Sequence, residues 1–267
     1  MIEFIEIFLI AMVQGIGEFL PISSTGHNAV LNHLFERFGK PLTGDSAGFI
    51  KLNILLHAGS LAAVLIVFRQ RIRDMFFKDQ RLISMLVVAT IPAVVVGYPI
   101  HQFVPWIQDY LPLISGCFII TGLFLLVTLR LPAGEKTCST MTWMDAVIIG
   151  CSQAFAILPG ISRSGTTIVT GLFCELQREE AAAFSFLLSI PVIVGSGLLE
   201  IVGMFKDSPK PSVQLIPDWF LLVGALVSCL AGILALIFLL DWLKKGKLWY
   251  FALWVFAMSL VTLALFF

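Results

Sequence analysis

Two short polar runs interrupt an otherwise apolar sequence, and they repeat one another. Residues 22–26 read Ile-Ser-Ser-Thr-Gly, and residues 161–165, 139 positions further along, read Ile-Ser-Arg-Ser-Gly. A proline precedes each run, at Pro21 and at Pro159. Hydroxyl, imidazole, carboxyl and guanidinium groups are costly to bury in apolar surroundings, so their presence there marks a functional site. The runs therefore predict one site built from two loops.

The two loops supply groups that suit phosphate binding. Serine and threonine cap helix N-termini, and two helix N-termini that meet form an anion site. Arg163 adds a positive charge with a planar fork that fits phosphate oxygens, and Glu18 is its expected partner when no substrate is bound. The alternative is a structural Arg–Glu pair with serines that only cap broken helices. The candidate binding residues in the loops are Ser23, Thr25, Gly26, Ser162, Ser164 and Gly165.

His27 and Glu18 offer acid–base and metal chemistry. The imidazole of His27 suits general acid–base catalysis or attack on phosphorus, and the alternative is a satisfied buried histidine. Glu18 can bind a divalent cation or act as a base. Gln14, one helical turn earlier on the same face, can add an oxygen ligand. For Asn53 and His57, two interpretations are equally favoured: they line the same cavity, or they occupy ordinary helical positions.

Composition indicates an integral membrane protein. The chain is 58% hydrophobic and 13% charged, whereas a soluble domain has about 25% charged residues. Lys+Arg and Asp+Glu each number 17, so no nucleic-acid partner is expected. The five cysteines show no CxxC pair or zinc spacing and are interpreted as small core residues. The N-terminus lacks the basic region of a signal peptide, so the whole chain is expected to be mature protein.

Six stretches are long and apolar enough to cross a bilayer, which takes about 20 residues. They are residues 49–68, 82–104, 111–129, 181–205, 219–240 and 248–267. Two further apolar regions, 2–35 and 145–174, are broken by proline and glycine. After each break about a dozen helical residues remain, or about 18 Å, which is too short to cross. Each region is predicted to be a re-entrant helix–loop–helix, and a pair of kinked spans is the alternative.

Charge predicts the orientation of these helices. Loops 69–81, 130–143, 175–180 and 241–247 hold 11 of the 17 basic residues. The opposite loops hold only Arg37, Lys40, Lys206 and Lys210. By the positive-inside rule the 11 lie in the cytoplasm and both termini lie outside.

The predicted fold is an all-α membrane protein with six transmembrane helices and two re-entrant pairs. Each half holds one re-entrant pair followed by three spans, so the halves run in opposite directions. Residues 1–135 and 136–267 are the expected inverted repeats of one membrane domain. In such repeats the binding site lies near the midplane, where broken helices meet.

Residues 14–27, Gln-Gly-Ile-Gly-Glu-Phe-Leu-Pro-Ile-Ser-Ser-Thr-Gly-His, resemble the first signature of the undecaprenyl-diphosphate phosphatases of the BacA/UppP type. Residues 159–167, Pro-Gly-Ile-Ser-Arg-Ser-Gly-Thr-Thr, resemble the second, and residues 57–64 and 184–188 resemble flanking segments of the family. The resemblance runs from about Phe4 to the C-terminus. The family's functional residues match Glu18, Ser24, His27, Ser162, Arg163 and Thr167.

The resemblance implies hydrolysis of undecaprenyl diphosphate to the monophosphate that carries peptidoglycan precursors, and with it bacitracin resistance. It implies an active site on the extracytoplasmic side of the bacterial plasma (inner) membrane. It also implies a divalent cation, Mg²⁺ or Ca²⁺, and no organic cofactor. Gln14 stands where the family often has a second glutamate. The expected partners are the lipid substrate and bilayer lipid, and a homodimer stays open beside a monomer.

In the predicted mechanism, Arg163 and the two helix N-termini hold the phosphates, while Glu18, with Gln14, positions the cation. Ser24 or His27 attacks the terminal phosphorus, and if Ser24 attacks, His27 accepts its proton. Phosphoryl transfer depends mainly on positioning and charge neutralisation. The alternative is a transporter or flippase of a polyprenyl phosphate, because inverted repeats with broken helices also form secondary transporters.

Overall fold

The computed structural model describes residues 2–37, 46–132, 134–206 and 217–267. Over these ranges the chain forms eleven α-helices and one 3₁₀-helix, η1, with no strand. Their bounds are α1 Ile2–Phe19, α2 Ser24–Arg37, α3 Ser46–Val67, α4 Arg69–Phe77, α5 Gln80–Phe103, η1 Pro105–Gln108, α6 Leu111–Val127, α7 Trp143–Phe155, α8 Arg163–Phe173, α9 Arg178–Lys206, α10 Asp218–Lys244 and α11 Tyr250–Phe266. Lys40 and Lys210, which entered the charge count, lie outside the described residues.

Four of the described helices are long and apolar enough to cross a membrane. The qualifying segments are Ile50–Val67, Gln80–Ile100, Arg178–Gly203 and Trp219–Lys244. α6 and α11 are also apolar but have 17 residues each, or about 25 Å at about 1.5 Å per residue, against a hydrocarbon core of about 30 Å. Over the residues that the structure describes, the chain is therefore an all-α integral membrane protein, as predicted, although two of the six predicted spans are shorter than the others.

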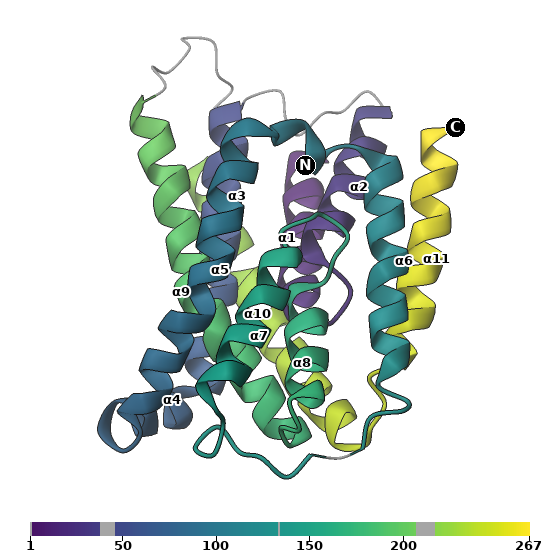
Figure 1. The fold of residues 1–267 in the computed structure, drawn as a ribbon. Coiled ribbons are helices and arrows are strands. Elements are labelled where there is room, and N and C mark those ends of the chain that lie inside the picture. Colours follow the sequence, from purple (N-terminus) through teal and green to yellow (C-terminus); the bar gives the residue numbers. More distant parts are fainter. Residues whose placement is uncertain (1, 38–45, 133, 207–216) are drawn as a thin grey trace.

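Both predicted helix breaks are present. α1 ends at Phe19 and α2 begins at Ser24, while α7 ends at Phe155 and α8 begins at Arg163. Proline has no backbone N–H and cannot continue a helix without loss, which explains why each break contains one. In Figure 1, α1 and α2 extend from their loop toward the end of the molecule that carries both termini, and α7 and α8 extend toward the opposite end. α2 has 14 residues and α8 has 11, which agrees with the short second helix that was predicted.

The loops predicted to share the cytoplasmic side contact one another. Arg71 of α4 forms an ion pair with Glu180 near the start of α9. Lys244, at the end of α10, lies 3.5 Å from Glu179. α4 and the loop that leads into α7 lie at the same end in Figure 1. The sequence predicted a loop at residues 69–81, whereas nine of these residues form the helix α4.

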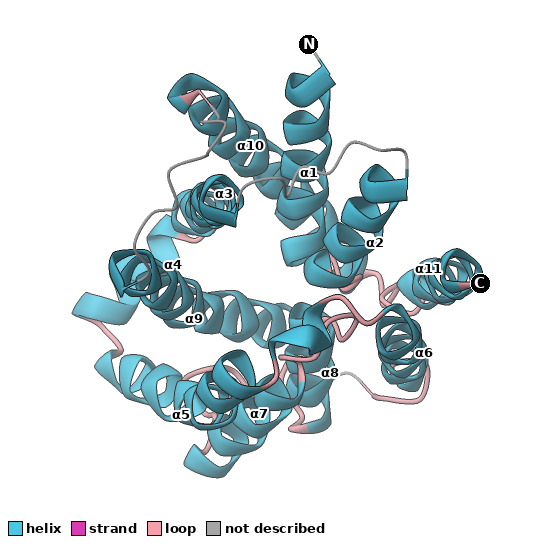
Figure 2. Cartoon of the chain, turned by 90° about the horizontal axis from the view of Figure 1, so that it is seen from above, coloured by secondary structure: helices cyan, strands magenta, loops and turns pink. Residues whose placement is uncertain are grey.

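The long helices pack closely in neighbouring pairs. α10 contacts both α1 and α3, α5 contacts α7, and α6 runs beside α11, an arrangement seen from above in Figure 2. A Cβ atom on Gly15 would lie 2.3 Å from the carbonyl oxygen of Ser228, so the contact between α1 and α10 requires glycine there. Small residues allow such close approach where lipid offers no hydrophobic drive for helix association.

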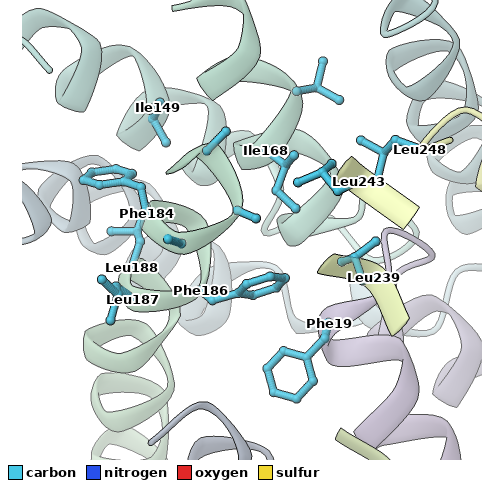
Figure 3. Close-up of a cluster of buried hydrophobic side chains, with 14 of the residues drawn as sticks. Phe19, Ile149, Ile168, Phe184, Phe186, Leu187, Leu188, Leu239, Leu243 and Leu248 are labelled. Atoms are coloured by element: carbon cyan, nitrogen blue, oxygen red, sulfur yellow. The ribbon is translucent and has the colours of Figure 1, made fainter. Parts of the chain in front are cut away.

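A buried apolar cluster lies beneath the first loop. Phe19, the last residue of α1, meets Phe186 of α9 edge to face, with ring centroids 5.8 Å apart. Both side chains are fully buried, and Leu239 of α10 lies beside them (Figure 3). The cluster therefore anchors the last residue of α1, directly before the loop that follows.

Candidate functional site

The two loops touch, as the sequence predicted. The backbone N–H of Gly160 donates to Ser23 Oγ at 3.1 Å, and Ser164 Oγ donates to the carbonyl of Leu20 at 3.2 Å. Gly160 has φ +94°, and a Cβ atom on it would lie 2.5 Å from the carbonyl oxygen of Ile114. Only glycine fits this conformation and this space without strain. The contact brings the ends of α1 and α7 and the starts of α2 and α8 to one place.

The two loops repeat in their hydrogen bonds as well as in their sequence. Ser23 Oγ accepts from the N–H of Gly26 at 3.3 Å, and Ser162 Oγ accepts from the N–H of Gly165 at 3.1 Å. Each serine hydroxyl also lies near the hydroxyl two residues further on, at 3.4 and 3.2 Å. Among the hydroxyl groups that the sequence offered as helix caps, those of Ser23 and Ser162 make the capping bonds. Ser23 has φ 69°, a left-handed conformation that is uncommon for a residue other than glycine.

Glu18 and Arg163 form a buried ion pair between the two halves of the chain. Arg163 Nη2 lies 2.8 Å from Glu18 Oε1, and the side chains are 17% and 9% exposed. Glu18 Oε2 accepts from Gln14 Nε2 at 3.0 Å and from Ser24 Oγ at 2.9 Å. Asn28 Nδ2 in turn donates to Gln14 Oε1 at 2.9 Å. Both carboxylate oxygens are therefore bonded, and the predicted Arg–Glu pair is present.

Five of the predicted site residues line one cavity of about 630 Å³. They are Glu18, Ser23, Ser24, Thr25 and Arg163. Much of the remaining wall is apolar and comes from α5 and α9. A pocket with a few convergent polar groups and an apolar wall suits a ligand that has a charged head and an apolar body.

The other seven predicted residues, all within the described ranges, lie outside that cavity wall. They are Gln14, Gly26, His27, Ser162, Ser164, Gly165 and Thr167. Thr167 Oγ1 donates to the carbonyl of Arg163 at 2.8 Å and lies 2.5 Å from Ser185 Oγ. It therefore fixes the first turn of α8, on which Arg163 stands.

His27 points away from the cavity in this structure. Its Nδ1 lies 2.8 Å from the carbonyl of Ser23, and its Nε2 accepts from the indole N–H of Trp254 at 2.8 Å. A carbonyl can only accept, so Nδ1 carries the proton and both ring nitrogens are engaged. The ring also meets Phe118 edge to face at 5.2 Å. For His27 to attack or accept a proton, Trp254 has to move, and the predicted catalytic role stays a prediction.

His57, which the sequence left evenly balanced, lines the cavity. Its Nδ1 lies 2.9 Å from the carbonyl of Asn53, one turn earlier in α3. The side chain of Asn53 donates to Glu200 Oε1 of α9 at 2.9 Å, and Glu200 also lines the cavity. α3 and α9 are thus joined by a polar contact at this wall.

Two residues of the site region were not predicted from the sequence. Gln153 is 2% exposed and belongs to the cavity wall, and neither its amide nitrogen nor its amide oxygen has a hydrogen-bond partner among the described residues. A lone amide in an apolar segment was the signal that could have found it. Thr121 Oγ1 accepts from the N–H of Ser162 at 3.0 Å and donates to the carbonyl of Gly160 at 2.9 Å. No sequence pattern indicated this second role.

A divalent cation can be held at the site only if the bound diphosphate supplies some of its oxygen ligands. In the part of the chain that the structure describes, no three His, Cys, Asp or Glu residues come together as a metal site. Glu18 and Gln14 offer one carboxylate and one amide oxygen. Mg²⁺ is commonly held by one or two carboxylates plus substrate phosphates. Glu18, on the cavity wall, fits a cation that arrives with a diphosphate, whereas Gln14 lies outside that wall and its amide oxygen accepts from Asn28.

Comparison with known proteins gives consistent matches along the chain. The family described as bacitracin resistance protein BacA matches residues 7–261. An undecaprenyl-diphosphatase of Rhodopirellula baltica is 41% identical over 266 residues, which cover 98% of each chain. Undecaprenyl-diphosphatase 4 of Bacillus cereus is 39% identical over 98% of this chain and 97% of the relative. An undecaprenyl-diphosphatase of Halothermothrix orenii is 34% identical over 98% of each chain.

Proposed function

The chain belongs to the bacitracin resistance protein BacA family, and we propose that it hydrolyses undecaprenyl diphosphate to undecaprenyl phosphate and inorganic phosphate. It is an undecaprenyl-diphosphate phosphatase, a hydrolase that renews the lipid carrier for cell-wall synthesis and contributes to bacitracin resistance. Relatives named undecaprenyl-diphosphatase match 98% of the chain at 34–41% identity. The alternative, a transporter or flippase of a polyprenyl phosphate, is not favoured by these matches.

The observation that carries the proposal is the Glu18–Arg163 pair on the wall of a partly apolar cavity. An arginine stays charged under all ordinary conditions, and its burial is costly unless an anion balances it. Glu18 engages one end of the guanidinium, and the other N–H groups of the fork can take phosphate oxygens. The apolar wall from α5 and α9 suits the first isoprene units of the lipid.

The residues of the first loop support a serine nucleophile. Ser24 lines the cavity, and its hydroxyl already donates to Glu18 Oε2 at 2.9 Å. Glu18 can therefore accept the proton as Ser24 attacks the terminal phosphorus. Arg163 and the N-termini of α2 and α8 then stabilise the charge on the transferring group. Trp254 holds His27, the other predicted nucleophile, away from the cavity.

The proposal includes a divalent cation, Mg²⁺ or Ca²⁺, at Glu18 and Gln14. When bound, it neutralises charge on the diphosphate. Glu18 would hold it through its carboxylate, and Gln14 through its amide oxygen once that oxygen is released from Asn28. No further residue of the chain is assigned to it.

The proposed topology has six spans, α6 and α11 included, and two re-entrant pairs that enter from opposite sides. The matched capping bonds of Ser23 and Ser162 support inverted repeats at residues 1–135 and 136–267. The packing of α1 on α10 and of α7 on α5 supports the same symmetry, since the repeats relate these two pairs. The proposed membrane is the bacterial inner membrane, with the site open to the extracytoplasmic side. The mutual contacts of the basic loops support this orientation under the positive-inside rule.

A phosphate-release assay tests the enzymatic proposal against transport. The purified protein is mixed with undecaprenyl diphosphate in detergent micelles, where it has no sidedness, and inorganic phosphate is measured with and without a chelator. Hydrolysis predicts phosphate release that falls when the cation is removed. A transporter predicts no release in micelles, together with movement of intact lipid phosphate across liposomes.

A further inference from the structure

The cavity contains a histidine other than the one that the sequence favoured. His57 of α3 lines the cavity, whereas His27 of α2 lies outside its wall with both ring nitrogens bonded. Histidine is the side chain best suited to move protons near neutral pH. The histidine of the first signature is therefore bonded outside the cavity, and a histidine from another helix lies on the cavity wall.

The hydrogen bonds of His57 leave one nitrogen available. Its Nδ1 lies 2.9 Å from the backbone carbonyl of Asn53, which can only accept, so Nδ1 carries the proton of the neutral ring. Nε2 then holds a lone pair, and it makes no hydrogen bond with any described residue. A ring fixed through Nδ1, with Nε2 free, is the arrangement that a general base needs.

The charged groups that share the cavity wall with His57 suit a proton carrier. They are Glu18, Arg163 and Glu200. Arg163 is paired with Glu18, and Glu200 accepts a hydrogen bond from Asn53. Two carboxylates and one guanidinium therefore share the cavity wall with the imidazole of His57.

We propose that His57 is the catalytic residue that donates and accepts protons in the phosphatase reaction, a role that rests on the function proposed above. In the first step Ser24 Oγ bonds to the terminal phosphorus and its proton passes to Glu18. The bond from that phosphorus to the bridging oxygen breaks, and its electron pair stays on the lipid monophosphate. His57 enters this step with a second proton, on Nε2, and gives that proton to this oxygen.

In the second step His57 acts in the opposite direction. A water molecule attacks the phosphoserine and gives its proton to Nε2 of His57. The bond between phosphorus and Ser24 Oγ breaks, and Glu18 returns the proton to that oxygen. Each group ends as it began, and the net change is one water consumed and one inorganic phosphate released.

The test compares His57→Gln with His33→Gln. The amide of glutamine keeps hydrogen-bonding capacity near the imidazole but cannot shuttle a proton. His33, on α2, is half-buried and lies outside the cavity wall. Phosphate release from undecaprenyl diphosphate in dodecyl maltoside is followed from pH 5 to pH 9. We expect His57→Gln to lower kcat by about 10²–10⁴-fold, the usual contribution of general acid–base catalysis, and to change the shape of the pH profile. KM stays within a few-fold, and His33→Gln keeps the wild-type rate.

Unchanged kcat and an unchanged pH profile in His57→Gln would overturn the inference while leaving the phosphatase intact. No release from the wild-type protein would instead overturn the proposed function. A second measurement uses the unmutated chain, in case the variant does not fold. Diethyl pyrocarbonate should modify His57, as mapped by mass spectrometry, and abolish phosphate release. Methylenediphosphonate, added beforehand, should prevent both the modification of His57 and the loss of phosphate release. Full activity after complete modification of His57 would contradict the inference.

Discussion

Replacing Arg163 by methionine removes the guanidinium from a buried ion pair and keeps most of the side-chain volume. Glu18 is then left 9% exposed, with hydrogen bonds from Gln14 and Ser24 but no positive partner. Removing one partner of a buried pair commonly costs about 3–5 kcal/mol. We therefore expect Arg163→Met to lower the free energy of unfolding substantially and to abolish phosphate release.

The size of this loss is limited because the stranded carboxylate can take up a proton. For a glutamate with an ordinary pKa of about 4.3, protonation at pH 7 costs about 3.7 kcal/mol, and at pH 5 it costs about 1 kcal/mol. The loss in Arg163→Met should therefore be about 3–4 kcal/mol at pH 7 and shrink to about 1 kcal/mol at pH 5. The sign follows from linkage, because the folded variant binds a proton that the unfolded chain releases above pH 4.3.

The reverse replacement, Glu18→Gln, supplies the matched contrast. It strands Arg163, and a guanidinium cannot lose its proton in this pH range. Its loss of stability should therefore be about 3–5 kcal/mol at both pH 5 and pH 7. The double variant Glu18→Gln/Arg163→Met leaves no buried charge at this place and should recover most of the stability, without recovering activity.

Unfolding is measured by circular dichroism as sodium dodecyl sulfate is titrated into dodecyl maltoside micelles, at pH 5, 6 and 7. The wild-type protein, both single variants and the double variant complete a double-mutant cycle. The reasoning fails if Arg163→Met is as stable as the wild type at pH 7. It also fails if the losses of the two single variants vary with pH in the same way.

Three further predictions concern the loops and the cation. Gly26→Ala should cost about 1–3 kcal/mol and reduce phosphate release, because its Cβ would lie 2.9 Å from Gly160 Cα. Gly116→Ala, with nothing within 4 Å of the added atom, is the control, and equal losses in both would contradict the close contact of the loops. Gln153→Leu removes a buried amide that has no partner among the described residues. The free energy of unfolding in detergent should therefore stay equal to that of the wild type or rise by up to about 3 kcal/mol. A large loss of stability would indicate that the amide is hydrogen-bonded. Gln14→Glu places a second carboxylate beside Glu18, where the wild-type protein has an amide 3.0 Å away. The free energy of unfolding should therefore fall in a chelator and return when Mg²⁺ or Ca²⁺ is added. If the cation changes the stability of this variant no more than that of the wild type, Glu18 is not the ligand of the cation.

Sequence reasoning predicted the parts of the site that depend on local chemistry. Pro21 and Pro159 lie in the two breaks, where their missing N–H removes a hydrogen bond from the helix ladder, and both breaks lie where they were expected. The repeated hydroxyl residues indicated helix caps in both loops, and Ser23 and Ser162 are the residues that form them. A lone arginine in apolar sequence needs a carboxylate, and Glu18 is its partner.

The parts that were missed depend on side chains contributed by distant helices. Thr121 of α6 joins Ser162 and Gly160, and nothing in the spacing of a single threonine indicates such a bridge. Trp254 of α11 turns the ring of His27 away from the cavity across 227 positions of sequence. Signature position alone could not distinguish a histidine that lines a cavity from one that faces a neighbouring helix.

The most direct test of the account is the stoichiometry of the reaction in detergent micelles. Purified wild-type protein is incubated with undecaprenyl diphosphate, and undecaprenyl phosphate and inorganic phosphate are both quantified, with Arg163→Met run in parallel. We expect the two products in equal amounts from the wild type and neither from the variant. Intact diphosphate after prolonged incubation with folded wild-type protein, or equal release from Arg163→Met, would contradict a hydrolytic site built on the pair of Glu18 and Arg163.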